Sequence, residues 1–384
     1  MRLGRLLYWA CTAVALPFNI NLNVNTNVNL NIDGDEMPLG VQTQELGLFP
    51  LHKKLVQTES LSFHEQEVSD FLVDYLQTLG LTVETINSNG RNNIYAYFGT
   101  TRDNTVLLTS HIDTVPPYIG YYDDGERIYG RGSCDAKASV AAQITAFSEL
   151  FQEQLIHEGD VALLFVVGEE TGGDGMQAVD ESIKASWKHV VFGEPTENKL
   201  AIGHKGVYYF KLKVHGVSSH SGYPELGQDA NNLLIKLMYQ LSTTNWPRDD
   251  LLGVTNVNIG LINGGTAANV ISPIAECEVL MRLSVNADQV EKIVDDIITN
   301  YQNVDITVVQ KADPTYLDYD VPGFDTMLAS YFTDIPNLTQ NGFKRYLYGP
   351  GSILVAHGDN EYVTYESLKE AVNGYKRLVT YGLN

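Results

Sequence analysis

Residues 161–175 read VALLFVVGEETGGDG, an apolar run that ends in two adjacent glutamates and a glycine-rich turn. An apolar run of this length that stops at glycine is typical of a strand buried on both faces of a sheet. Glu169 and Glu170 would then lie where the interior of the sheet meets solvent. Like charges this close disfavour each other's ionised form. The pair is therefore either a solvated loop tip or part of a functional site, and other segments of the chain have to decide between these two interpretations.

Similar runs surround this stretch and indicate an α/β fold. Residues 93–99 (NIYAYFG) and 105–110 (TVLLTS) precede it, and 189–195 (HVVFGEP) adds another strand end. A helix is expected after Asp135, because apolar residues recur there at helical spacing: Val140, Ile144, Phe147 and Phe151. Strand, helix and strand in this order predict a parallel sheet covered by helices.

An earlier helix is marked by Ser62-Phe-His-Glu65, the pattern of a capping box. Apolar residues follow it at helical spacing, and Gly80 is expected to end the helix.

From about residue 207 the pattern changes to half-exposed strands. The strands 207–216, 254–264, 275–285 and 304–310 alternate with helices expected at 229–242 and 287–300. This β-α-β-β-α-β order predicts a small ferredoxin-like α+β unit inserted in the chain. We therefore assign residues 45–205 and 314–384 to the main domain, which ends in a helix from Thr364, and residues 206–313 to the inserted unit.

The N-terminal region predicts export from the cell. Residues 1–18 combine early arginines, a short apolar run and an A-x-A-like exit, as in a secretory signal peptide, although a buried amphipathic helix is the alternative. Residues 19–44 form an asparagine-rich leader that we exclude from the fold. For a secreted protein, Asn337 in Asn-Leu-Thr would be a glycosylation site. Cys134 and Cys277 would be two free thiols or one disulfide, and the sequence leaves both open.

Net charge narrows the class of partner. The 384 residues include 25 Lys and Arg against 47 Asp and Glu, a net charge of −22. Such a surface repels phosphate backbones and anionic lipid, so we expect neither nucleic acid nor a membrane as a partner.

Five segments place acids or histidines where strands end: SHIDTVPP (110–117), GRGSCDAK (130–137), GEETGG (168–173), FGEPTE (192–197) and AHGDNEY (356–362). In open α/β sheets, ligands gather at the carboxyl ends of the strands, so these segments would converge.

Each residue of this set also has a structural alternative. His111 and Asp113 lie on one face of a strand end, as a metal-bound histidine and its orienting carboxylate would, or as an ordinary core pair. Asp135 would bind a cation or cap the following helix. Glu194 and His357 taken singly would be turn residues. Together, two histidines and three carboxylates match the ligands of a pair of zinc-like ions with one carboxylate shared.

The ordered motifs resemble the M20 metallopeptidase family, which includes secreted carboxypeptidases, aminoacylases and acetylornithine deacetylases. The set is SHIDTVPP, GRGSCDAKAS, GEETGG, FGEPTE, SSHSGYP, GGTAANVISP and GPGS…AHGDNEY, covering about residue 48 to the end. The resemblance implies a zinc-peptidase-like mixed sheet flanked by helices, with the inserted unit as a lid and dimerisation domain.

The resemblance also implies roles for individual residues. His111, Asp135 and Glu194 would hold one zinc, and Asp135, Glu170 and His357 the other, so that Asp135 bridges them. Glu169 would be the general base, and Asp113 would orient His111. Cobalt or manganese would also suit these nitrogen and oxygen ligands.

In the inserted unit, the resemblance implies that His220 reaches across a homodimer toward the scissile carbonyl. Asn269 and Arg282 would hold the carboxylate of the substrate. The alternatives are a loop histidine and a surface arginine, although a guanidinium fork does pair well with a carboxylate.

These observations predict a secreted two-zinc carboxypeptidase that releases a C-terminal amino acid from peptides. An N-acyl-amino-acid amidohydrolase of the aminoacylase or acetylornithine-deacetylase type is the alternative within the class. A zinc-loaded binding protein without turnover is the alternative outside it, and the presence of Glu169 argues against that one.

Overall fold

The computed structural model describes residues 45–184 and 187–384. The predicted signal peptide (1–18) and asparagine-rich leader (19–44) lie outside the described residues. No helix among those described is long and apolar enough to cross a bilayer.

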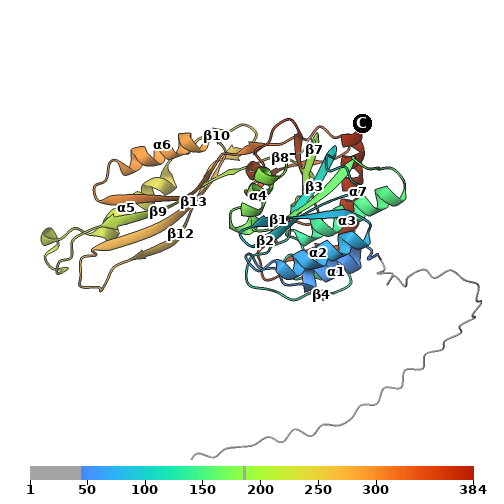
Figure 1. Cartoon of the computed structure of the whole chain (residues 1–384). Coiled ribbons are helices and arrows are strands. Elements are labelled where there is room, and N and C mark those ends of the chain that lie inside the picture. Colours follow the sequence, from blue (N-terminus) through green and yellow to red (C-terminus); the bar gives the residue numbers. More distant parts are fainter. Residues whose placement is uncertain (1–44, 185–186) are drawn as a thin grey trace, which may run out of the picture. The chain divides into compact units, whose positions relative to one another are not determined.

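A six-stranded mixed sheet forms the centre of the main domain (Figure 1), with the strand order β1-β2-β6-β3-β7-β17. The strands are β1 Thr82–Ser88, β2 Arg91–Tyr97, β3 Val106–His111, β6 Val161–Val166, β7 His189–Phe192 and β17 Lys344–Leu347. As predicted, β3, β6 and β7 run parallel, and β17 joins them. β2, which no helix separates from β3, is antiparallel to β6, so the sheet is mixed, as the resemblance implied. Asn89 and Gly90, both with positive φ, form a two-residue turn that pairs β2 with β1 as a hairpin.

Helices cover both faces of this sheet. Successive strand residues point to opposite sides, so apolar strands bury side chains on each face. Leu163 and Phe165 of β6 join a core beneath α1 (Leu48–Gln57), α2 (Gln66–Thr78), α3 (Lys137–Gln152) and α7 (Tyr365–Leu383). Leu164 and Val166 join a second core beneath α4 (Asp174–Ser182). The apolar run in residues 161–168 is therefore buried on both faces, as predicted.

The capping box predicted at Ser62 and Glu65 is wrong, although helix α2 begins at Gln66 and ends just before Gly80 as expected. Glu65 is the N-cap and makes no side-chain cap, because its carboxylate accepts from Arg91. The hydroxyl of Ser62 donates to Asp113 instead, at 2.8 Å. Tertiary partners therefore compete successfully with the local pattern.

The inserted unit has the predicted β-α-β-β-α-β order. Its four strands form an antiparallel sheet in the order β12-β13-β9-β14. Its elements are β9 Gly206–His215, α5 Ala230–Thr243, β12 Asn256–Gly264, β13 Ile274–Leu283, α6 Ala287–Ile298 and β14 Val304–Ala312. Both helices contribute apolar side chains to one core on this sheet.

Short strands complete the described chain. They are β4 Tyr122–Asp123, β5 Arg127–Tyr129, β8 Leu200–His204, β10 Arg248–Asp249, β11 Gly253–Val254, β15 Thr315–Tyr316, β16 Thr326–Ala329 and β18 Tyr362–Thr364. Three short 3₁₀ turns lie at Glu169–Thr171, Pro224–Leu226 and Ile335–Asn337. Cys134 and Cys277 are separate buried thiols, which decides between the two possibilities that the sequence left open.

Candidate metal centre

The strand-end motifs converge as predicted. His111 is the last residue of β3, Asp135 precedes α3, and Glu194 follows β7. Glu169 and Glu170 follow β6, and His357 lies in the loop between β17 and β18.

Asp135 lies between the two histidines. Its Oδ1 is 3.0 Å from Nε2 of His111, and its Oδ2 is 3.3 Å from Nε2 of His357. Nε2 of His357 is also 3.0 Å from Oε1 of Glu170, and Nε2 of His111 is 3.7 Å from Oε1 of Glu194. Asp135 does not cap α3, whose N-cap is Ala136. One carboxylate with an oxygen toward each histidine is the arrangement that a shared ligand of two cations requires.

Asp113 has more partners than the sequence indicated. Nδ1 of His111 is 3.0 Å from the backbone oxygen of Asp113 and 3.5 Å from its carboxylate Oδ1, which directs Nε2 toward Asp135. The Asp113 carboxylate also accepts the backbone N–H groups of Glu169 and Glu170, at 3.1 and 3.2 Å. Asp113 therefore contacts both the histidine and the loop that carries the paired glutamates.

The paired glutamates lie in a 3₁₀ turn that follows β6, and their side chains have different partners. Gly168 precedes the turn with φ 71°, and Gly172 follows it with φ 120°. Glu170 bonds to His357, whereas an oxygen of Glu169 groups within 4.8 Å with ligand atoms of His111 and Glu194. A second such group joins His111, Asp135 and Glu170.

The electrostatics of the cluster favour a bound cation. Burial, together with neighbouring carboxylates, raises the pKa of Glu169 and of Glu194 well above the usual value. Burial alone would lower the pKa of His111, but Glu194, Asp113 and Asp135 raise it well above its usual value. Contacts with Asp135 and Glu170 raise the pKa of His357 to about 10. Divalent cations would relieve the repulsion among these buried carboxylates, and the imidazole and carboxylate groups are donors that suit ions such as zinc.

A cavity of about 630 Å³ lies in front of this cluster. Arg282 of β13 is the only lysine or arginine among the described residues that line it. Burial lowers the pKa of this guanidinium, and Glu169 partly offsets that effect. His220 and Asn269 do not line the cavity and lie in exposed loops of the inserted unit.

Two further residues of the cavity wall, Tyr331 and Asp334, were not predicted from the sequence. Tyr331 donates its hydroxyl to the backbone oxygen of Pro195, beside Glu194. Asp334 is buried, and burial raises its pKa to about 7. Both belong to segment 331–337, whose FTDIP sequence carries no pattern that would place it at a strand end.

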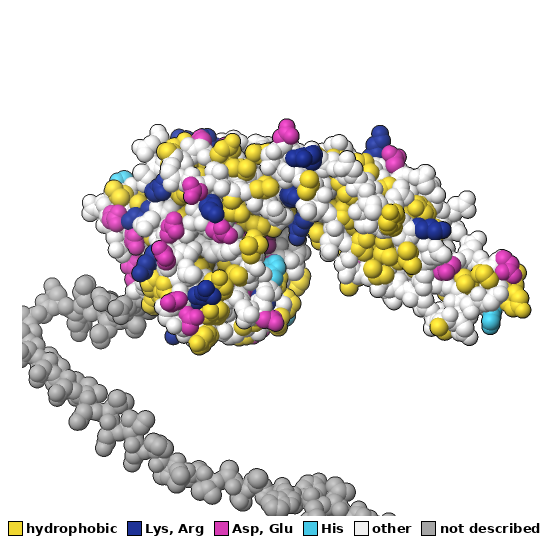
Figure 2. Space-filling model, turned by 180° about the vertical axis from the view of Figure 1, so that it is seen from behind, with side chains coloured by type: hydrophobic (Ala, Val, Ile, Leu, Met, Phe, Trp, Pro, Cys, Tyr) yellow, Lys and Arg dark blue, Asp and Glu magenta, His cyan; other side chains and the backbone are white. Residues whose placement is uncertain are grey.

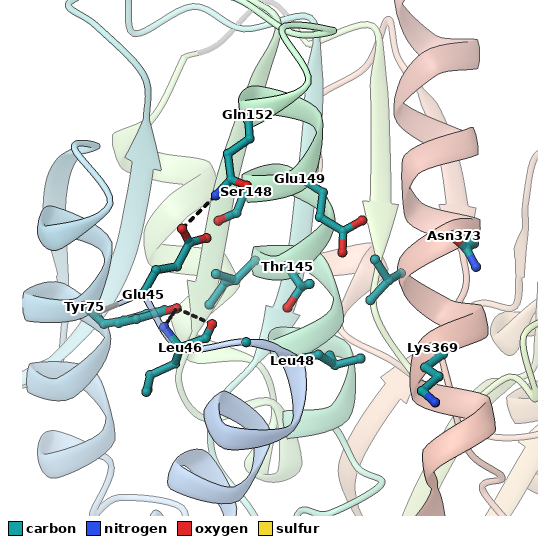
Figure 3. Close-up of a pocket in the computed structure, with 13 residues that line it drawn as sticks. Glu45, Leu46, Leu48, Tyr75, Thr145, Ser148, Glu149, Gln152, Lys369 and Asn373 are labelled. Carbon is teal, nitrogen blue, oxygen red and sulfur yellow. Dashed lines mark hydrogen bonds between the residues drawn. The ribbon is translucent and has the colours of Figure 1, made fainter. Parts of the chain in front are cut away.

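A second cavity, of about 520 Å³, opens between α1, α3 and α7 (Figure 3). Gln152 donates to Glu45 at 2.7 Å, and Tyr75 donates to the backbone oxygen of Leu46. No histidine or cysteine occurs among the described residues that line it, and its two carboxylates, Glu45 and Glu149, belong to no group of candidate metal ligands.

The cluster offers imidazole and carboxylate groups that could hold metal ions, and comparison with known proteins identifies the family. The chain belongs to peptidase family M20/M25/M40, which it matches over residues 107–381. It is therefore a hydrolase that acts on peptide bonds.

Relatives with curated sequences extend this likeness over most of the chain. A peptidase M20 domain-containing protein of Schizosaccharomyces pombe is 50% identical over 340 residues, which cover 88% of this chain and 85% of that protein. A probable carboxypeptidase of Aspergillus flavus is 40% identical over 380 residues, covering 88% and 90%.

Solved structures share the fold at low sequence identity. A tripeptidase of Staphylococcus aureus superposes with a TM-score of 0.75 at 21% identity, covering 88% of this chain and 99% of that one. A dinuclear metal-binding M20 peptidase of Bacillus subtilis gives 0.65 at 17% identity, covering 88% and 97%.

Proposed function

We propose that this M20 peptidase is a secreted two-zinc carboxypeptidase that releases a C-terminal amino acid from peptides. The observation that carries the proposal is the position of Asp135, with one carboxylate oxygen toward each histidine. The description of the Bacillus subtilis relative as dinuclear supports the metal stoichiometry, and the Aspergillus flavus relative supports the reaction class.

Five residues would hold the two ions, and Glu169 would transfer the proton. His111, Asp135 and Glu194 would hold one zinc, and Asp135, Glu170 and His357 the other. When bound, the ions would polarise the amide carbonyl and make a water molecule more acidic. Glu169 would take the proton from the attacking water and later donate it to the leaving amine. The backbone N–H bonds to Asp113 hold Glu169 in place for both transfers.

Arg282 supports the preference for a C-terminal residue. It is a cation at the wall of a cavity that otherwise holds several acids. A free substrate carboxylate would pair with its guanidinium and be kept away from those acids. Blocking the C-terminus as an amide should therefore raise KM more than it changes kcat.

The test combines metal removal with a substrate panel. Chelation should abolish hydrolysis of a blocked dipeptide, and zinc should restore it, with mass spectrometry identifying the released residue. Release of only the N-terminal residue from a tripeptide, or faster turnover of an N-acetyl amino acid, would contradict carboxypeptidase activity. Full activity in protein shown by elemental analysis to be metal-free would refute the metal-dependent mechanism.

Secretion is part of the same proposal and rests on residues 1–18. Protein recovered from the medium should lack these residues, and N-terminal sequencing will show whether the leader 19–44 is removed too. Recovery of the full-length chain only from inside the cell would contradict secretion. The mass change on glycosidase treatment will show whether Asn337, whose amide lies 3.4 Å from the backbone oxygen of Gly172, carries a glycan.

We further propose a homodimer formed through the inserted unit. Figure 2 shows hydrophobic side chains gathered on the visible face of this unit. Strand β12 is at the edge of its sheet and exposes Leu261 and Ile262, each 62% accessible. An apolar edge strand pairs readily with a second copy. A dimer would also allow His220, which is outside the cavity of its own chain, to act in that of the partner.

Light scattering will test the dimer. The substitution Ile262→Lys should give a monomer, whereas Leu155→Lys, at an exposed apolar position in the main domain, should leave the dimer intact. Co-expression of His220→Ala chains with Glu169→Gln chains should recover activity if the histidine is supplied by the partner. A monomeric wild type would refute the dimer. Mixed dimers that recover no activity would refute the role of His220 in the cavity of the partner.

A further inference from the structure

A buried ion pair lies next to the candidate metal ligands and has no role in the proposed mechanism. Nη1 of Arg131 donates to Oε2 of Glu361 at 2.6 Å, and the side chains are 1% and 0% exposed. Burying two charges is costly, so a pair of this kind needs excellent geometry and further hydrogen bonds. Both side chains have such bonds, and these lead to the ligand-bearing segments.

Glu361 binds the segment that carries the shared ligand. Its Oε1 accepts the backbone N–H groups of Cys134 and Asp135, each at 3.1 Å. These bonds fix the backbone from which the Asp135 carboxylate reaches between the two histidines.

Arg131 binds the segment that carries His357, another of the ligands proposed for the second cation. Nη2 donates to the backbone oxygen of His357 and Nη1 to that of Gly358, both at 3.3 Å. Nε donates to the backbone oxygen of Pro117, also at 3.3 Å, which anchors the guanidinium from a third side.

Besides these bonds, the end of the loop is held by the His357 side chain, which contacts Asp135 and Glu170, and by the bond from the N–H of Gly358 to the oxygen of Val355. Residues 357–360 are exposed, and Leu354 is 87% exposed. His357 has φ 64°, a conformation that non-glycine residues seldom adopt unless their surroundings impose it. His111 and Glu194, by contrast, lie at the ends of central strands.

We infer that Arg131 and Glu361 are positioning residues that set the affinity for the second cation, the one held by Asp135, Glu170 and His357. The inference rests on the proposed two-metal function and deepens it. Neither side chain is among the proposed metal ligands or among the described residues that line the cavity. The pair joins two ligand segments that are far apart in the chain, those of Asp135 and His357. The first cation shares only Asp135 with these segments, so loss of the pair should weaken the second metal position much more than the first.

The test is a metal titration of the chelated protein, which does not depend on activity. Cobalt would be added in steps while its visible absorption is recorded, and zinc binding would be measured by calorimetry. Glu361→Gln keeps an acceptor for the N–H groups but ends the ion pair. Arg131→Lys keeps a charge for Glu361 but cannot also reach the backbone oxygen of His357.

Each variant should weaken the second binding step by about 10- to 100-fold, as loss of an outer partner of a metal ligand typically does. The first step should change by less than about threefold. The double variant Arg131→Met/Glu361→Gln should weaken the second step no more than Glu361→Gln does, because both substitutions break one unit.

Leu76→Ala serves as the control for general destabilisation, because Leu76 is a fully buried residue of α2 that is not part of the cluster. It should lower the unfolding temperature without changing either binding step. Three outcomes would overturn the inference while leaving the two-metal function intact. They are an unchanged affinity of the second binding step in Glu361→Gln, an equal loss of affinity in both steps, and the same loss of affinity in Leu76→Ala. A wild type that binds a single cation would refute the two-metal function, and the inference with it.

Discussion

The two adjacent glutamates offer the sharpest test of the site, because the structure gives them different surroundings. Glu170 is 3.0 Å from His357, whereas the Glu169 side chain makes no hydrogen bond to another described residue. We therefore expect Glu170→Gln to remove a metal ligand and Glu169→Gln to remove a base. Both substitutions preserve shape, so the folded protein should survive in each case.

The size of the effect follows from the proposed role of Glu169. General base catalysis contributes about 10²- to 10⁴-fold, which corresponds to roughly 3–5 kcal/mol of transition-state stabilisation. The kcat of Glu169→Gln should fall by that factor while KM changes little and two metal equivalents remain. Glu170→Gln should instead lose about one equivalent, and excess zinc should partly restore its activity. Glu181→Gln, at an exposed glutamate of α4, should match the wild type in both measurements.

The assay pairs elemental analysis of gel-filtered protein with steady-state kinetics on one blocked dipeptide. The geometry also places Glu169 close enough to His111 and Glu194 to share a cation with them. Loss of a metal equivalent in Glu169→Gln, with recovery in excess zinc, would show that Glu169 is a ligand. A fall in kcat of less than about tenfold with full metal content would show that the base is another group.

Three further outcomes test the surroundings of the site. Gly168→Ala should destabilise the fold by more than the roughly 1–2 kcal/mol that a left-handed backbone costs, because a Cβ there meets the Asp174 carboxylate and would displace it from its ion pair with Arg91. Gly80→Ala, with a similar φ and open space, should cost only that amount in the same denaturant titrations, and equal losses would contradict the packing argument. Ser62→Ala should cost about 1–3 kcal/mol and lower kcat, because the buried Asp113 carboxylate loses a donor, and a neutral result would mean that water replaces the hydroxyl. Burial lowers the pKa of His204 to about 4, so the unfolded chain binds a proton that the folded chain does not, and stability is lost as pH falls from about 6.5 toward 4. The variant His204→Asn should therefore lose about 2 kcal/mol less than the wild type between pH 7 and pH 5 in denaturant titrations, and identical losses would contradict the assigned protonation.

Several features of the fold could be predicted because they depend on local pattern. The apolar runs at 105–110 and 161–168 are buried strands, and the alternating strands and helices from 206 onward form the expected β-α-β-β-α-β unit. The helix from Thr364 begins as expected, with that hydroxyl accepting the N–H of Ser367. Errors arose where a distant partner decided the outcome, as with the capping box whose serine binds Asp113.

The sequence by itself determined which residues stand at the ends of the strands, because apolar runs and glycine turns set the places where strands stop. It also brought His111, Asp135, Glu170, Glu194 and His357 into one candidate set, whose roles as ligands stay predictions. Only the tertiary structure decided how these residues face each other. The two oxygens of Asp135 point to histidines from segments far apart in the chain, and the ion pair of Arg131 and Glu361 joins the same segments from behind. Such contacts depend on the packing of the whole domain, which no local spacing records.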